Sequence, residues 1–293
     1  MSDATGNAPA VPSLASTKRV RRKLTLFGAI GIALLGVNLA CALFGSFLAP
    51  HPPGDINPGG AFAPPSGTAL LGTDYLSRDL FSRLLDGARF SIGVAGLATC
   101  IGFLVGMSIG FTAAEIRGRL DMAVTWAVDV LLSFPPILLA LLVIAGLGTS
   151  LPVLIGTIAF IQSPRVARVA RAVALGIAAL EFVEVARARG ESLASILIRE
   201  IFPSAVRPLA VEFGLRLSYA VLFMSSLSFL GLGIQPPDAD WGGMVRENLP
   251  GLYYGALASI VPGVMIGLLV LGINLTVDWL SAGADAQMSE ELR

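Results

Sequence analysis

The sequence predicts an all-α membrane protein with six transmembrane helices. The 293 residues are 55% hydrophobic and only 14% charged, and the mean hydropathy is +0.78, whereas charged residues make up about 25% of an ordinary soluble protein. Six segments reach the length of about 20 mostly apolar residues that a helix needs to cross the hydrocarbon core. The strict apolar–polar alternation that would indicate a membrane β-barrel is missing from the sequence.

The first predicted span, residues 24–49, follows a tail at 1–23 that is rich in small residues and ends in five basic residues. We expect the tail to be disordered and cytoplasmic. A cleaved signal peptide is an alternative, as is a lipoprotein signal with Cys41 as the lipidated residue. The apolar run continues past Cys41, and Asn38 stands where a lipoprotein signal favours Leu. We therefore expect a retained membrane anchor.

A segment rich in Pro and Gly follows the first span, and we group residues 24–87 as an addition to a five-helix core at 88–281. Leu76, Leu80 and Leu84 recur there at intervals of four residues. This spacing places them on one face of a helix. We expect an interfacial amphipathic helix that leads into the second span, residues 90–114. The remaining predicted spans are residues 122–147, 151–174, 208–234 and 256–280.

The distribution of Lys and Arg predicts the orientation, because cytoplasmic loops retain these residues. With the N-terminus inside, cytoplasmic segments hold five, two, eight and one of them, a sum of 16, and the outer segments hold four. Both termini, including the tail at 282–293, are then expected in the cytoplasm. The charged segment at 179–203, between the fourth and fifth spans, is expected there as well.

The sequence offers little from which to build a catalytic or metal site. The lysines are Lys18 and Lys23, and neither follows a glycine, so a phosphate-binding G-x-x-x-x-G-K loop is impossible. Cys41, Cys100 and the single histidine, His51, have no metal-ligand spacing. We expect a protein that is not an enzyme and binds no cofactor. A net charge of zero gives no indication of nucleic-acid binding.

The segment at 179–203 has the pattern of two short helices separated by a turn. Glu184 and Arg187, three residues apart, support a first helix, which Gly190 ends by adopting the left-handed cap conformation. Ser192 can cap a second helix, in which Leu193, Ile196 and Leu197 form an apolar ridge. Pro203 is expected to end that helix. Such an element has the shape of a helix that a partner's groove holds. A solvated loop is the alternative.

The spacing of Glu184, Ala186, Gly190 and Pro203 resembles the EAA loop of permeases in bacterial ATP-binding-cassette importers. The stretches "LGTDYLSRDLFSRLLDGARFSIGVA" (71–95), "AVDVLLSFPPILLAL" (127–141) and "FLGLGIQPPDADWGGMV" (229–245) resemble segments of the permeases for dipeptides, oligopeptides and nickel. The last is the most specific match. The resemblance covers nearly the whole chain to about residue 280, and departs from the family pattern in the C-terminal "NLTVDWLSAGADAQM".

This resemblance implies a type I importer permease fold in the bacterial inner membrane and a role as the second permease of a heterodimeric pair. The expected partners are a homologous permease, two ATPase subunits that bind ATP and Mg, an extracytoplasmic binding protein and membrane lipid. Di- or oligopeptides are the expected substrates, with nickel or another small solute as the alternative. The residues implied in ATPase coupling are Glu181, Glu184, Ala186, Arg187, Gly190, Glu191, Ser192 and Pro203.

Polar residues within the predicted spans are candidates for a translocation path or gate, because ionisable groups in membranes usually face the bundle or water. The candidates are Asp129, Glu212, Arg216, Ser225, Ser226 and Ser228. Arg165 and Arg168 lie on the inner half of the fourth span. Internal ion pairs that fix helix packing are the alternative explanation for the charged residues, and helix crossings for the serines.

The external loop before the last span carries Asp238, Asp240 and Trp241, which we consider candidates for docking of the binding protein. Trp241 with Tyr253 and Tyr254 can instead form an aromatic belt at the membrane interface. A secondary transporter or channel that works without ATPases is the main rival function, and it would require coupling-ion sites near the midplane. A membrane scaffold without transport activity is a third possibility.

Overall fold

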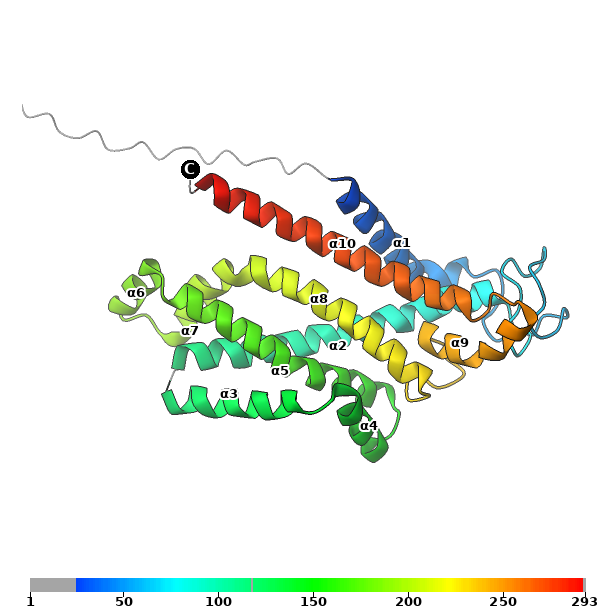
Figure 1. Cartoon of the computed structure of the whole chain (residues 1–293), viewed down its shortest axis with the longest axis horizontal. Coiled ribbons are helices and arrows are strands. Elements are labelled where there is room, and N and C mark those ends of the chain that lie inside the picture. The colour runs from blue at the N-terminus through cyan, green and yellow to red at the C-terminus, as the bar shows by residue number, and fades with distance from the viewer. Residues whose placement is uncertain (1–24, 117, 292–293) are drawn as a thin grey trace, which may run out of the picture.

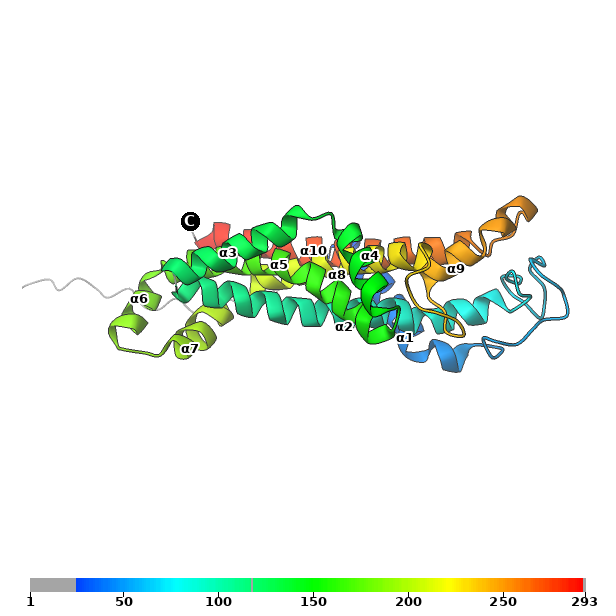
Figure 2. The same ribbon diagram turned by 90° about the horizontal axis from the view of Figure 1, so that it is seen from below.

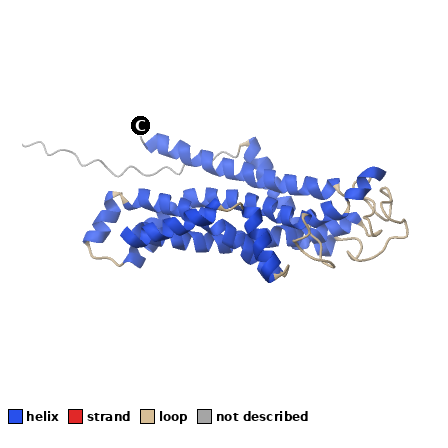
Figure 3. Cartoon of the chain, turned by 60° about the horizontal axis from the view of Figure 1, so that its bottom comes forward, coloured by secondary structure: helices blue, strands red, loops and turns tan. Residues whose placement is uncertain are grey.

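The computed structural model describes residues 25–116 and 118–291, with side chains as far as residue 282. The described part forms helices joined by loops, without a β-strand (Figure 3). The helices make an elongated bundle, with α6 and α7 at one end and the loop before α2 together with α9 at the other (Figures 1 and 2). The predicted tail at 1–23 lies outside the described residues. In the predicted tail at 282–293, the backbone to Glu291 continues α10.

Five helices are long and apolar enough to cross a membrane. A sixth span is obtained if a bent pair of shorter helices counts as one. The sequence therefore predicted the fold class correctly. The long helices are α1 (Leu26–Leu48), α2 (Leu80–Ile116), α5 (Leu151–Ala178), α8 (Phe202–Phe229), which continues a helical stretch from Leu193, and α10 (Ile260–Glu291); the bent pair is α3 (Gly118–Ser133) with α4 (Pro136–Leu147).

The predicted interfacial helix before the second span is wrong as a separate element. Leu76 lies in a turn, and α2 starts at Leu80 and runs without a break to Ile116. The side chain of Asp79 accepts a hydrogen bond from the backbone N–H of Ser82 at 2.9 Å, as a helix N-cap does. Leu80 and Leu84 are buried in the core rather than placed at a lipid interface.

The predicted third span is broken in its middle, where α3 and α4 meet at an angle of 89°. The break coincides with Pro135 and Pro136. A proline lacks an N–H and its ring clashes with the carbonyl of the preceding turn, so a helix cannot pass two of them unchanged. The two prolines could have predicted the break, but the prediction of residues 122–147 as one span relied on their apolar length alone.

Close helix contacts hold the bundle together. Gly102, Gly106 and Gly110 recur at four-residue steps along α2 and face α5, where a Cβ at Gly106 would lie 2.5 Å from the carbonyl oxygen of Ser163. Only glycine permits this approach. The α1 helix packs on α10, with Gly31 against the backbone of Thr276. A second, smaller core lies where α2, α5, α6 and the start of α8 converge, and it includes Phe111, Ala174, Val183, Ala186, Ile201 and Leu209.

Candidate functional site

The α6 helix (Glu181–Ala188) stands at one tip of the bundle (Figure 1). Val183 and Ala186, three residues apart, form its buried face and belong to the smaller core. That core also contains residues of α2, α5 and α8, so α6 belongs to the same packed cluster as the ends of three long helices. We expect a movement of α6 to reach these helices through the cluster.

The turn after α6 has the predicted geometry. Gly190 has a φ of +76°, in the left-handed region. Its N–H donates to the carbonyl of Arg187 at 2.9 Å, and the N–H of Glu191 donates to the carbonyl of Ala186 at 3.3 Å. These bonds satisfy carbonyl groups that the end of a helix leaves free. Ser192 then caps α7 (Leu193–Ser195), accepting a bond from the Ser195 N–H at 3.3 Å.

The prediction that Pro203 ends the second short helix is wrong. A π-helical stretch, η1 (Ile196–Ile201), joins α7 to α8, and Pro203 lies in the first turn of α8. The N–H of Phe202 bonds to the carbonyl of Leu197, five residues earlier. This wider turn makes room for the proline ring, which would otherwise clash with a carbonyl one turn before. The chain from Leu193 to Phe229 is thus one helical stretch.

The charged side chains of the loop divide into an inner and an outer set. Arg187 faces inward, where its guanidinium binds the buried carboxylate of Glu115 at the end of α2. Glu191 accepts hydrogen bonds from Arg189 at 2.6 Å and from Ser195 at 2.9 Å. Both hydrogen bonds lower the pKa of Glu191, and the bond from Arg189 has the larger effect. Glu181 and Glu184 are exposed.

The segment from α6 to the start of α8 also exposes apolar side chains. The predicted ridge is only partly correct, because Ile196 is buried in the smaller core while Leu193 is exposed. The π-helical turns rotate the residues after Ser195 relative to an α-helix, which the predicted spacing assumed. The exposed apolar side chains of this part of the chain are Leu180, Phe182, Val185, Leu193, Ile198 and Phe202.

The charged path candidates form ion pairs, and both a packing role and a place on the path remain predictions for them. Glu212 binds Arg216 on the same helix at 2.6 Å. Asp129 binds Arg168, which links α3 to α5. Sequence reasoning missed a third pair, Asp121 with Arg171, whose Nε and NH2 atoms each lie 2.6 Å from one carboxylate oxygen. The spacing of Asp121 eight residues before Asp129 could have indicated it.

The serine candidates on α8 bond mostly to their own helix. The hydroxyl of Ser225 donates to the carbonyl of Val221, and that of Ser226 to the carbonyl of Leu222, each at 2.8 Å. Ser228 is buried and lies beside Asp240. These bonds satisfy the hydroxyl donors within the helix, and a lining role for the three serines remains a prediction.

Two of the three docking candidates are buried. Asp240 caps α9 (Trp241–Glu247), accepting bonds from Gly242 and Gly243, and burial raises its pKa. Trp241 is fully buried, with its indole N–H donating to the carbonyl of Leu84 at 2.9 Å. Neither side chain offers a surface to a partner, and Trp241 cannot belong to an interfacial belt. Asp238 is half exposed and lies 3.9 Å from Arg89.

The tip of the external end exposes aromatic side chains. Tyr253 and Tyr254 end η2 (Leu249–Tyr254), and Tyr253 is 93% exposed. The ring of Tyr254 stacks on Phe62 with 5.8 Å between centroids. The helix η2 thus holds the loop that precedes α2.

A buried network of charges holds the external segment to α9. Asp74 is fully buried and binds Arg78 at 2.7 Å and Arg83 at 3.4 Å. Arg83 also reaches Glu247 of α9 at 3.4 Å. Burial raises the pKa of Glu247, and the nearby Arg78 partly offsets this effect. The motif at 71–95 therefore has a structural role, which is to attach the loop to the helix bundle.

Comparison with known proteins identifies a matching family and several relatives. Residues 102–290 match the family described as "Binding-protein-dependent transport system inner membrane component". The chain is 35% identical over 224 residues to the glutathione transport system permease protein GsiD of Pectobacterium atrosepticum, which covers 76% of this chain and 74% of that protein. It is 31% identical over 259 residues to the dipeptide transport system permease protein DppC of Alkalihalophilus pseudofirmus, covering 88% and 85%. The GsiD protein of Escherichia coli is 34% identical over 278 residues, covering 92% and 89%.

Proposed function

Because the chain belongs to the family of binding-protein-dependent transport system inner membrane components, we propose that it is a permease subunit of an ATP-driven peptide importer. The relatives bear the names of dipeptide and glutathione transport systems. Glutathione is itself a small peptide, so both names support a peptide substrate. Nickel or another small solute is the alternative substrate that the resemblance to this family allows. Substrate would arrive on an extracytoplasmic binding protein.

The observation that carries this proposal is the packing of the α6 and α7 segment. The α6 helix exposes Glu181 and Glu184 together with apolar side chains, while Ala186 buries its inner face in the smaller core. An outer surface that is both acidic and apolar suits a helix held in a partner's groove. We infer that the partner is an ATPase, which binds ATP and Mg and moves α6 when it closes.

The proposed assembly has this chain, a second homologous permease and two ATPase subunits in the bacterial inner membrane. The external segment and α9 lie at the end of the bundle opposite α6 (Figure 2). With the 16 to 4 distribution of basic residues, this separation supports an orientation in which α6 and both termini face the cytoplasm. Tilting of the attached spans by α6 would then open the path alternately to each side.

The test is reconstitution of the complex in proteoliposomes with the binding protein and a labelled dipeptide. Uptake should require ATP on the side of the membrane where the ATPases bind. ATPase chains should also co-purify with this subunit. Uptake that needs an ion gradient but no ATP would instead support the secondary transporter. Co-purification without any flux of peptide or nickel would support the scaffold.

A further inference from the structure

A stripe of polar side chains follows the contact between α3 and α5. Asp121, Thr125 and Asp129 recur at four-residue steps on α3, which places them on one helix face. Arg171 binds Asp121, and Arg168 binds Asp129. The stripe therefore extends from the α6 end of α3 towards its other end. Each step is a charged or hydroxyl group at the contact between α3 and α5.

The pair of Asp129 and Arg168 lies within the predicted third and fourth spans and is exposed. Asp129 is about 17 Å along the axis from the start of α3, and the hydrocarbon core is about 30 Å thick. In the isolated chain the two side chains are 54% and 58% exposed. Charged groups at such depth face water or protein rather than lipid tails. Something polar must therefore cover this face.

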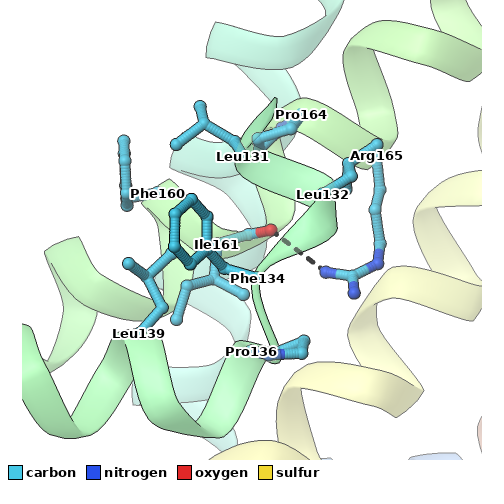
Figure 4. A pocket seen from close by; sticks show the side chains of 9 residues that line it. All are labelled: Leu131, Leu132, Phe134, Pro136, Leu139, Phe160, Ile161, Pro164 and Arg165. Atoms are coloured by element: carbon cyan, nitrogen blue, oxygen red, sulfur yellow. Dashed lines mark hydrogen bonds between the residues drawn. The ribbon is translucent and has the colours of Figure 1, made fainter. Parts of the chain in front are cut away.

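The break between α3 and α4 allows water as the cover. It follows directly after the stripe, and its irregular backbone is tolerated at membrane depth where it lines a wet cavity or is buried in protein. Phe134 in the break is 52% exposed, so this chain does not bury it. Broken helices of this kind line solute sites in other transporters. A small hollow lies here, lined by residues that include Leu132, Phe134, Pro164 and Arg165 (Figure 4).

Arg165 differs from the two arginines that follow it on α5. Arg168 and Arg171 each bind a carboxylate, whereas among the described residues none lies within ion-pair distance of Arg165. Its guanidinium donates to the carbonyl of Ile161 at 3.2 Å (Figure 4) and lies 5.5 Å from the ring centre of Tyr219. A guanidinium has five N–H donors in a planar fork that matches a carboxylate. Most of that capacity is free.

We propose that the α3–α5 polar stripe lines the inner half of a water-filled path and that Arg165, at its deep end, binds the carboxylate of the transported solute. This inference rests on the proposed function. The solute class is a small molecule with a free carboxylate, such as a peptide with an unmodified C-terminus. The paired Asp129 and Asp121 carry no net charge with their arginines, so Arg165 supplies the excess positive charge of the path.

The location is tested by thiol labelling of the assembled complex in inside-out vesicles, with Cys41 and Cys100 replaced by Ala. Leu132→Cys continues the stripe and lines the hollow. Ala127→Cys is the matched control, since Ala127 is exposed on the opposite face of α3. A membrane-impermeant methanethiosulfonate should label Leu132→Cys about tenfold faster, because lipid excludes charged reagents. Equal rates, or no labelling at Leu132→Cys, would overturn the wet path.

The charge of the site is tested with two such reagents, one anionic and one cationic, at Leu132→Cys. Arg165→Gln should lower the ratio of anionic to cationic labelling rates about tenfold, because it removes one nearby positive charge. Arg207→Gln, which removes an exposed arginine at the start of α8, is the control and should leave the ratio unchanged. An unchanged ratio in Arg165→Gln would contradict the anion site. Neither measurement depends on which solute the importer carries.

Uptake separates this inference from the proposed function. In proteoliposomes, Arg165→Gln should lower the uptake of a dipeptide relative to that of its C-terminal amide about tenfold, compared with the same ratio in the wild type. The binding protein is the same in both, so its own preference cancels. If the wild-type complex takes up no dipeptide, the proposed substrate is wrong, and the labelling ratios still decide on Arg165. Equal loss of both solutes would overturn the carboxylate contact.

Discussion

The guanidinium of Arg187 in α6 binds the carboxylate of Glu115 at the end of α2, with N–O distances of 2.9 and 3.3 Å. A further N–H of Arg187 lies 3.3 Å from the carbonyl of Ala178 at the end of α5. One side chain thus ties the candidate coupling helix to two long helices. Arg187 belongs to the set implied in ATPase coupling, but it faces its own chain rather than a partner.

Exchanging the charges of Arg187 and Glu115 tests whether this ion pair matters. Arg187→Glu and Glu115→Arg should each lower the free energy of unfolding by about 1–3 kcal/mol, because a buried charge loses its partner. Each should also lower the amount of solute transported per ATP. The double exchange should restore part of both quantities. If each single variant keeps the wild-type transport per ATP in proteoliposomes, the pair has no part in coupling.

Gly190 should tolerate asparagine but not valine. A Cβ at Gly190 meets no atom within 4 Å, so the only obstacle is the φ of +76°. Valine in this conformation costs about 1–2 kcal/mol, whereas asparagine adopts it readily. Gly190→Val should reduce co-purification of the ATPases, and Gly190→Asn should keep it. Equal binding by both variants would show that the angle between α6 and α7 does not matter.

Glu184 should contact the ATPase directly, because its side chain is exposed on the outer face of α6. Glu184→Lys places a positive charge there and should weaken ATPase association by about 2–5 kcal/mol if the contact is a buried charge pair. Glu184→Gln keeps the shape and should have a smaller effect. Insertion into the membrane should be normal in both. Wild-type ATPase stimulation in Glu184→Lys would indicate a solvated loop.

Asp240 should make the external end less stable as the pH rises. Burial raises the pKa of Asp240 above 3.8, so the folded state holds the proton more tightly than the unfolded chain. The free energy of unfolding therefore falls as the pH rises from about 3.8 through the raised pKa. Asparagine is an equally good N-cap without a charge. The Tm of Asp240→Asn relative to wild type should be higher at pH 7 than at pH 4, and the reverse order would contradict this assignment.

Single cysteines at two exposed positions should report the orientation. Arg189→Cys lies in the loop after α6, and Asp238→Cys lies in the loop before α9. In intact cells, an impermeant thiol reagent should label Asp238→Cys and not Arg189→Cys, as the distribution of basic residues predicts. Labelling of Arg189→Cys from outside would overturn the six-span topology. Permeabilised cells, in which both positions should react, provide the control.

Apolar length and glycine geometry made most of the fold predictable. The spans and the turn at Gly190 depend on local chemistry, namely hydropathy and a positive φ, which the sequence states directly. The roles of Arg187 and Trp241 depend on what lies opposite them. Their partners are Glu115, 72 residues before Arg187, and Leu84, 157 residues before Trp241. One sequence without the fold does not specify such pairs.

The errors at Leu76 and Pro203 have a different cause. In both places the sequence pattern was assigned to a separate element, whereas the structure has a turn at Leu76 and continues a long helix through Pro203. Helix ends depend on caps and on tertiary packing as much as on periodicity. At Pro203 a π-helical turn absorbed the proline, and nothing in the spacing of apolar residues predicts such a turn.

The unbroken α2 helix has a mechanical consequence. Its 37 residues are about 55 Å long, nearly twice the thickness of the hydrocarbon core. Arg83, near one end, belongs to the external charge network, and Glu115, near the other, binds α6. A rod pivoting near its centre by about 10° would move each end by about 5 Å in opposite directions. Through the same pivoting of α2, a protein that binds at the external end would move α6.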